Sequence, residues 1–154
     1  MNTVVKDRAR TLLTNDRGTA FIELALVMTV YLLLLLGAFE FGRLAYISVE
    51  VANAAHAGVQ YGAQTQATAA NSAGMQAAAI SDAPDVAGMT ATATNYCKCS
   101  NGTSVSCTGT CTGSHMIQYV QVNTSVTVAP IFTYPTGLPP SLTLTGAAVM
   151  RVEQ

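Results

Sequence analysis

A single carboxylate, Glu23, lies at the head of the most apolar part of this 154-residue chain. No charged residue follows it until Glu40, so residues 24–39 form an uncharged run. An ionised carboxylate in apolar surroundings costs at least a few kcal/mol unless a cation or hydrogen-bond donors accompany it. Glu23 therefore needs a partner of opposite charge, or it must lie within reach of water.

Four cysteines form the second group with chemical potential: Cys97, Cys99, Cys107 and Cys111. Four thiolates can hold a tetrahedral zinc ion, but the C-x-C and C-x3-C spacing departs from the usual C-x2-C pairs. Disulfides are favoured instead if the segment is exported, and three pairings are then open. A Cys97–Cys99 bond is disfavoured because residues two apart on a strand are too far apart for relaxed geometry. We expect a nested pairing across an intervening turn.

The other polar residues predict no enzyme, no cofactor and no metal site. His56 and His115 show no repeated spacing with carboxylates, and both are expected at the surface. Asp82 and Asp85 flank Pro84 and are expected to be turn residues. Only 10% of the residues are charged and the formal net charge is −1, so there is no basic footprint for nucleic acid.

The uncharged run belongs to a segment long enough to cross a membrane. Counted from Thr19 it has about 21 residues, which as a helix cover about 30 Å, the thickness of a bilayer's hydrocarbon core. A buried core helix is disfavoured because five consecutive leucines leave no polar face. A secretory signal peptide is disfavoured because its small-residue cleavage sites, near residues 52–57, lie too far beyond Phe39. We expect a retained transmembrane helix over residues 19–40.

The charges around this helix predict its orientation. Four basic residues precede the span, whereas only Arg43 follows it before Lys98. By the positive-inside rule, residues 1–18 are a cytoplasmic leader and the rest of the chain is exported. The protein is therefore expected to cross the inner (cytoplasmic) membrane once, with its cysteines in an oxidising compartment.

The junction at Gly18 resembles the processing site of type IV prepilins. It has a basic leader, a glycine, and a carboxylate five residues further on at the head of an apolar helix. The resemblance implies that a prepilin peptidase cuts after Gly18, so that Thr19 becomes the first residue. Glu23 of one subunit can then neutralise the new α-amino group of another, since a paired charge is tolerable where a lone one is not. The alternative is that Glu23 lies at headgroup level, about one turn inside Gly18.

The helix is expected to continue as an amphipathic segment over residues 41–66. Its apolar stripe recurs in steps of three and four residues and comprises Leu44, Ile47, Val51, Ala54, Gly58 and Tyr61. We expect this stripe to pack on a sheet of the same chain. Small residues permit close helix contacts, and contacts through Gly37, Gly42 and Gly58 are expected to serve assembly with other subunits.

Three blocks of this helix stand in a fixed order: residues 18–27 (GTAFIELALV), 39–46 (FEFGRLAY) and 53–63 (NAAHAGVQYGA). Together they resemble the TadE-like family of pilin-like proteins of the tight-adherence (Flp-type) pilus system. His56 stands where the family often has a basic residue, and Thr19 where alanine is usual. The resemblance implies a membrane-anchored pseudopilin or minor pilin, processed by the system's prepilin peptidase and needed to assemble an adhesive pilus.

Residues 67–154 are predicted to form a small exported domain with a cysteine-rich hairpin. Asn71 or Ser72 is expected to cap a short helix that reaches about Ile80 and ends before Pro84. Strands are expected over residues 89–99, 118–128 and 142–152, the last two antiparallel, with a hairpin turn at residues 101–102. Residues 129–141 hold four prolines and are expected to form a stiff loop. Phe132 and Tyr134 in this loop are expected to anchor it in the core or to form an exposed contact.

The predicted fold class is α+β, with one long N-terminal helix packed on a small antiparallel sheet, as in pilins. The expected function is a structural or assembly role in a tight-adherence pilus or secretion system. The expected partners are the prepilin peptidase, other pilin-like subunits, the assembly machinery and the lipid bilayer. The alternative is a single-pass anchored binding module unrelated to pili, whose proline-rich and cysteine-rich loops present a ligand surface.

Overall fold

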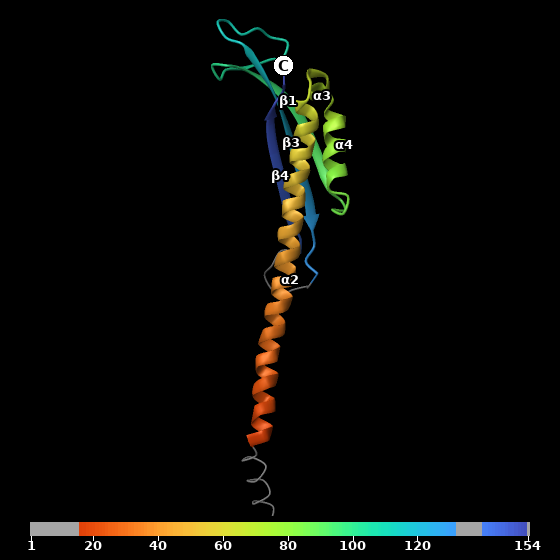
Figure 1. Ribbon diagram of the computed structural model, residues 1–154, viewed down its shortest axis with the longest axis vertical. Helices are drawn as coiled ribbons and strands as arrows, with labels where there is room; N and C mark the ends of the chain where they lie inside the picture. Colours follow the sequence, from red (N-terminus) through yellow and green to blue (C-terminus); the bar gives the residue numbers. More distant parts are fainter. Residues whose placement is uncertain (1–15, 132–139, 154) are drawn as a thin grey trace, which may run out of the picture. The chain divides into compact units, whose positions relative to one another are not determined.

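The computed structural model describes residues 16–131 and 140–153 of the chain, and it confirms the α+β class (Figure 1). The elements in order are α2 (Asp16–Ala63), α3 (Gln66–Ala70), α4 (Ser72–Asp82), β1 (Thr90–Cys99), β2 (Ser104–Val105), β3 (Met116–Val128) and β4 (Leu142–Arg151). The chain divides into two compact units, Met1–Gly42 and Arg43–Gln154, and α2 contributes residues to both.

In the first unit, α2 has the surface of a helix that faces lipid. Its large apolar side chains are exposed from Phe21 to Phe41, the latter at 80%. Thr29 donates its hydroxyl to the carbonyl of Ala25 at 2.8 Å, so that polar group is satisfied within the helix. Among the described residues, α2 is the one helix that is long and apolar enough to cross a membrane. The predicted span is thus a helix, which begins at Asp16 rather than at Thr19.

The second unit contains one antiparallel sheet with the strand order β2-β1-β3-β4. The central strand β3 aligns Val122 with Ala93 on one side and with Ala148 on the other. Alternate residues of β3 are buried, which confirms the predicted period of two and gives the sheet one apolar face. The expected antiparallel pairing of the last two long strands is also confirmed.

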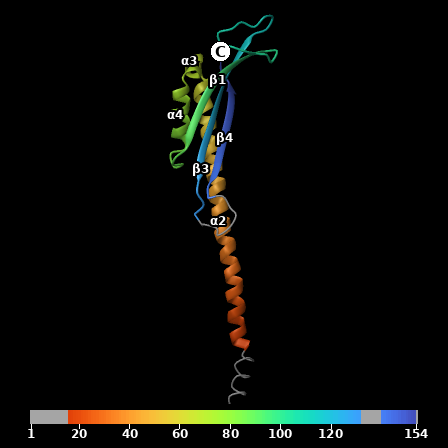
Figure 2. The same ribbon diagram turned by 180° about the vertical axis from the view of Figure 1, so that it is seen from behind.

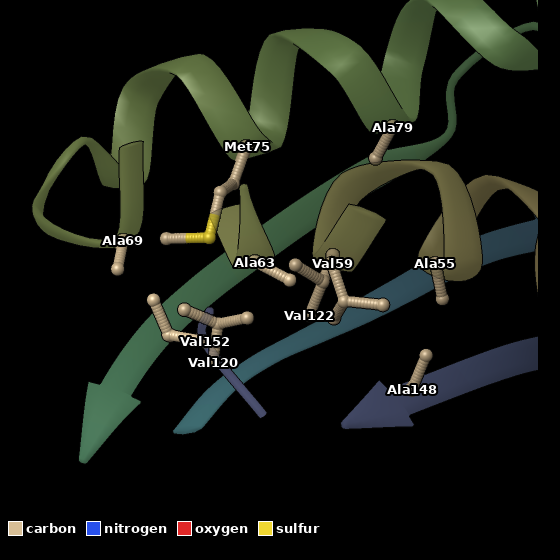
Figure 3. Close-up of a cluster of buried hydrophobic side chains, with 10 residues drawn as sticks. All are labelled: Ala55, Val59, Ala63, Ala69, Met75, Ala79, Val120, Val122, Ala148 and Val152. Carbon is tan, nitrogen blue, oxygen red and sulfur yellow. The ribbon is translucent and has the colours of Figure 1, made fainter. Parts of the chain in front are cut away.

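Helices α2 and α4 pack on this apolar face, as the two opposite views show (Figures 1 and 2). Between them and the sheet lies a cluster of mostly small side chains: Ala55, Val59, Ala63, Ala69, Met75, Ala79, Val120, Val122, Ala148 and Val152 (Figure 3). Met75 is fully buried and fills the space that the alanines leave. The α2 stripe predicted from its spacing therefore packs on its own chain's sheet.

The backbones of α2 and the sheet meet at Gly146 on β4. A Cβ atom at this position would lie 2.5 Å from the carbonyl oxygen of Val51 and 2.7 Å from the hydroxyl of Thr124. Thr124 is buried and donates that hydroxyl to the Val51 carbonyl at 2.6 Å. The contact requires a residue with no side chain on β4 and a small hydrogen-bonding residue on β3.

Capping residues set the boundaries of the two short helices between α2 and β1. Asn71 accepts a hydrogen bond from the amide of Gly74 at 2.9 Å and caps α4, and Ala83, before Pro84, ends that helix. Both boundaries agree with the sequence prediction. The short helix α3 was not predicted, and Thr65 caps it in a reciprocal arrangement with Thr68. Phe132 and Tyr134 lie outside the described residues.

Gly146→Ala is expected to destabilise the second unit by about 1–3 kcal/mol, because the added methyl group overpacks the contact with Val51. The neighbouring change Ala147→Val is the matched control. Ala147 is exposed on the same strand, so its substitution should alter stability by no more than about 0.5 kcal/mol. Urea denaturation of the detergent-solubilised full chain, followed by circular dichroism, measures both. Equal stability of the two variants would contradict the proposed contact.

Candidate functional site

The predicted processing site lies at the start of α2. Gly18 and Thr19 are both helical in backbone conformation, so the bond between them falls in the first turn of the helix. First turns lack half of their hydrogen bonds and fray readily. Such a position suits a bond that a peptidase must draw into an extended conformation.

Glu23 lies one turn further along α2 and is exposed. Its sequence neighbours Ile22 and Leu24 are exposed at 65% and 56%, and both are apolar. The carboxylate therefore projects from a helix surface whose other side chains favour lipid or the apolar surface of another helix. In either setting a charged group is stable only beside a cation or donors.

The three glycines expected to serve assembly lie in different environments. A Cβ atom at Gly37 or Gly42 would meet no described heavy atom within 4 Å, so both positions are open to a neighbour. Gly58, in contrast, is buried, and a Cβ atom there would lie 3.0 Å from the Met75 carbonyl and from a methyl group of Val122. Gly58 therefore serves contacts within its own chain, which corrects the expected contact with another subunit.

The cysteines form two disulfides, Cys97–Cys107 and Cys99–Cys111. The pairing is interleaved, so the expected nested pairing is wrong. Cys97 and Cys99 lie on the buried face of β1, at 2% and 8% exposure. Because Val105 of β2 lies directly opposite Cys97, the chain brings Cys107 back to Cys97 first and reaches Cys99 only with Cys111. Local spacing does not reveal this path.

The predicted turn at residues 101–102 is present next to these bonds. The amide of Gly102 donates to the carbonyl of Cys99 at 2.8 Å, and Gly102 adopts a φ of 90°, which glycine tolerates best. The amide of Cys99 also donates to the carbonyl of Thr103, so the hydrogen bonds of the hairpin begin directly beside the turn. Strand β2 then ends after two residues, and the disulfides hold the following loop instead of a longer ladder.

A cleft that the sequence did not predict lies entirely within the second unit. We name it the Arg43 cleft; it has a volume of about 320 Å³ and is lined by Arg43, Tyr46, Ile47, residues 85–87 and residues 126–129. Arg43 donates an Nη2 hydrogen to the carbonyl of Ala129 at 2.7 Å. Tyr46 donates its hydroxyl to Oδ2 of Asp85 at 3.0 Å. Asp85 was predicted only as a turn residue beside Pro84, but it also accepts this hydrogen bond from α2.

The same carboxylate changes the acidity of the tyrosine. The hydrogen bond to Asp85 raises the pKa of Tyr46 above its usual value, and the charges of Asp85 and Glu50 act in the same direction. Tyr46 therefore stays protonated and remains a donor to Asp85 throughout the physiological pH range. The cleft thus presents one guanidinium and one carboxylate that is partly satisfied by a neutral hydroxyl.

The structure adds nothing that resembles a catalytic centre in its described part. His56 and His115 are both exposed, as expected. Within residues 16–131 and 140–153, no group of three or more metal-binding side chains comes together.

The family model of the TadE-like protein matches residues 18–60. The match begins at the glycine of the predicted processing site and ends within α2. It confirms the TadE-like resemblance over the anchor helix and points to a protein associated with the tight-adherence pilus. No curated protein and no solved structure matched the chain.

The disulfide connectivity is directly testable in the unreduced protein. Trypsin cuts after Lys98 and separates Cys97 from Cys99, and elastase, which cuts after small residues, can cut at Gly109 between Cys107 and Cys111. Mass spectrometry of the linked peptides should then recover Cys97 with Cys107 and Cys99 with Cys111. Peptides that join Cys97 to Cys111 would contradict the interleaved pairing.

Removing one bond should also lower stability. Each disulfide closes a short loop, with sequence separations of 10 and 12 residues. The double variant C97S/C107S is expected to lose about 2–4 kcal/mol of unfolding free energy in urea denaturation. Thr110→Ala, an exposed change in the same loop, is the control and should be close to neutral.

Proposed function

We propose that this TadE-like chain is a membrane-anchored, pilin-like component of a tight-adherence pilus or secretion system. Its role is structural or in assembly, and it is not an enzyme. The family match over residues 18–60 carries the proposal, because that segment contains the apolar helix and the glycine junction together. The exposed apolar surface of α2 supports membrane anchoring.

The proposed topology places the leader in the cytoplasm and the second unit on the far side of the inner membrane. The excess of basic residues before the span supports this orientation. The two disulfides support it independently, because such bonds persist in oxidising compartments and are rare in the cytosol.

Cleavage after Gly18 would create an α-amino cation close to the depth of Glu23. The mature chain would begin at Thr19, and its α-amino group would pair with Glu23 of a neighbouring subunit. Close approach of the two helices is compatible with Gly37 and Gly42, whose surfaces are open. The pair would form in a low-dielectric environment, where attraction between opposite charges is strong.

Processing is tested by intact mass and N-terminal sequencing of the membrane-extracted protein. The expected mature chain starts at Thr19, and Gly18→Leu should abolish the cleavage by changing the residue at the scissile bond. A chain that retains residues 1–18 would contradict prepilin-type processing and would favour an anchored binding module. A start near residues 52–57 would indicate a discarded signal peptide.

The role of Glu23 is tested by Glu23→Gln, which removes the charge and keeps the shape. Membrane insertion should persist, because a neutral side chain enters the bilayer more easily than a charged one. Surface pili should fall by about tenfold or more, as expected if one ion pair worth about 1.4 kcal/mol or more is lost. Glu153→Gln, an exposed carboxylate of the second unit, is the matched control. Normal piliation in the Glu23 variant would refute the pairing.

A further inference from the structure

The sheet of the second unit has an outer face, which points away from α2 and α4 (Figures 1 and 2). It is formed by the even-numbered residues of β1 and the odd-numbered residues of β3 and β4, because the other residues of these strands face the helices. On β4 the odd-numbered residues from 143 to 151 are all exposed. The outer face is therefore a surface that a partner can reach.

Both basic residues that follow Arg43 lie on this outer face, although they are far apart in the sequence. Tyr96, Tyr119 and Arg151 form one row across β1, β3 and β4, and Lys98 follows two residues after Tyr96 on β1. The fold thus gathers the two cations, Lys98 and Arg151, at one end of one face.

The acidic residues that follow Arg43 lie on other elements. Asp85 binds the Tyr46 hydroxyl of α2, and the amide of Glu153 donates to the carbonyl of Ala63 at the end of α2. The other two are Glu50 on α2 and Asp82 at the end of α4. Strands β1, β3 and β4 contain no Asp or Glu, so the charge that they present on the outer face is positive.

Two stacked aromatic rings lie between the cations. The ring centroids of Tyr96 and Tyr119 are 5.4 Å apart, and the ring planes differ by 15°. The ammonium of Lys98 lies 5.6 Å from the centroid of the Tyr96 ring, so a cation–π contact holds it beside the stack. Both rings are half-buried, and their neighbours on the sheet hold them in place. The result is an ordered aromatic platform with a cation on either side.

Uncharged polar groups continue from this platform along the outer face. Gln121 and Asn123 follow Tyr119 on β3, and the Gln121 amide donates to the Asn123 carbonyl oxygen at 3.2 Å. A groove of about 370 Å³ comes next, lined by Thr90, Thr92, residues 123–125 and residues 145–147. From Tyr119 to Ser125 the strand covers about 20 Å at roughly 3.4 Å per residue. The strip is thus long and offers hydroxyl and amide groups.

We propose that this outer face binds an anionic polysaccharide that contains uronic acid residues. The carboxylates would pair with Lys98 and Arg151, and the C–H faces of the sugar rings would pack on the tyrosines. The sugar hydroxyls would exchange hydrogen bonds with the amides and threonine hydroxyls of the strip. The two cations arise two strands apart, which is about 10 Å across the sheet, so a polymer with repeated charges fits better than a single anion.

The distribution of charge favours a polysaccharide over a nucleic acid. A nucleic acid carries a phosphate on every nucleotide, and its binding sites neutralise many of them with lysine and arginine. Here the strip has two cations at one end and neutral groups along the rest. Neutral hydroxyl and amide groups complement the hydroxyls of a sugar chain, which outnumber its carboxylates.

The test measures binding of fluorescently labelled oligogalacturonate to the full chain in detergent by fluorescence anisotropy. A Kd of about 0.1 mM is expected for a few exposed polar contacts and one aromatic platform. The matched ligand is the methyl ester of the same oligosaccharide, which keeps the sugar rings and removes the charges. It should bind at least about tenfold more weakly, as expected for the loss of two exposed ion pairs. Raising the ionic strength from about 0.05 to 0.5 M should weaken binding of the acid form by screening.

Substitutions on the outer face test the assigned residues. Lys98→Gln and Arg151→Gln should each weaken binding about threefold to fivefold, and the double variant at least about tenfold. Arg151→Lys is the matched control, because it keeps the charge, and it should stay within about twofold of wild type. Tyr119→Phe should also stay close to wild type, whereas Tyr119→Leu removes the aromatic surface and should weaken binding about fivefold. Circular dichroism of each variant checks that the fold is retained.

Several results would overturn this site. They are no saturable binding at millimolar oligogalacturonate, equal binding of the methyl ester, and unchanged affinity in the folded double variant. Tighter binding of oligo-dT would assign the face to nucleic acid, and tighter binding of polyglutamate would assign it to an acidic peptide. Either outcome would refute the polysaccharide. The site lies wholly within the second unit, so its failure would leave the proposed pilus function unaffected.

Discussion

The second unit depends on the contact between the backbone of α2 and the sheet at Gly146. Only a residue without a side chain allows the Val51 carbonyl to approach β4 so closely, and Thr124 uses that approach to donate a buried hydrogen bond. Interiors are packed to the density of organic crystals, so a contact this close sets the separation of helix and sheet along its length. The small residues around it, such as Ala55 and Ala148, follow from that separation.

A core of alanines and valines buries little apolar area per residue, and the rest of the second unit compensates for this. Among the described residues Met75 is the largest fully buried side chain, and it fills the gap between α4 and the sheet. The two disulfides fasten the loop where β2 ends after two residues and the ladder can contribute no further bonds. Small domains with weak cores commonly rely on such cross-links.

Helix α2 differs along its length in which side chains are exposed. From Phe21 to Phe41 its large apolar side chains are exposed, which suits a lipid environment, whereas Glu40 is buried. From Arg43 onward one face is buried against the sheet, and the other carries polar residues such as Asn53 and Gln60. The change in the burial of α2 begins at Arg43, whose guanidinium donates to the carbonyl of Ala129 just beyond β3.

The sequence by itself determined the features that depend on neighbours a few residues away. The apolar run, the α2 stripe, the alternation in β3, the Asn71 cap and the stop before Pro84 were predicted because propensity and period are local properties. Only the tertiary structure decided the interleaved disulfides, the internal role of Gly58, and the meeting of Arg43 and Tyr46 with the residues around Asp85. Those features depend on the path of a loop or on contacts between distant segments. Sequence spacing does not indicate which distant surfaces will meet, because the packing of the whole core decides this.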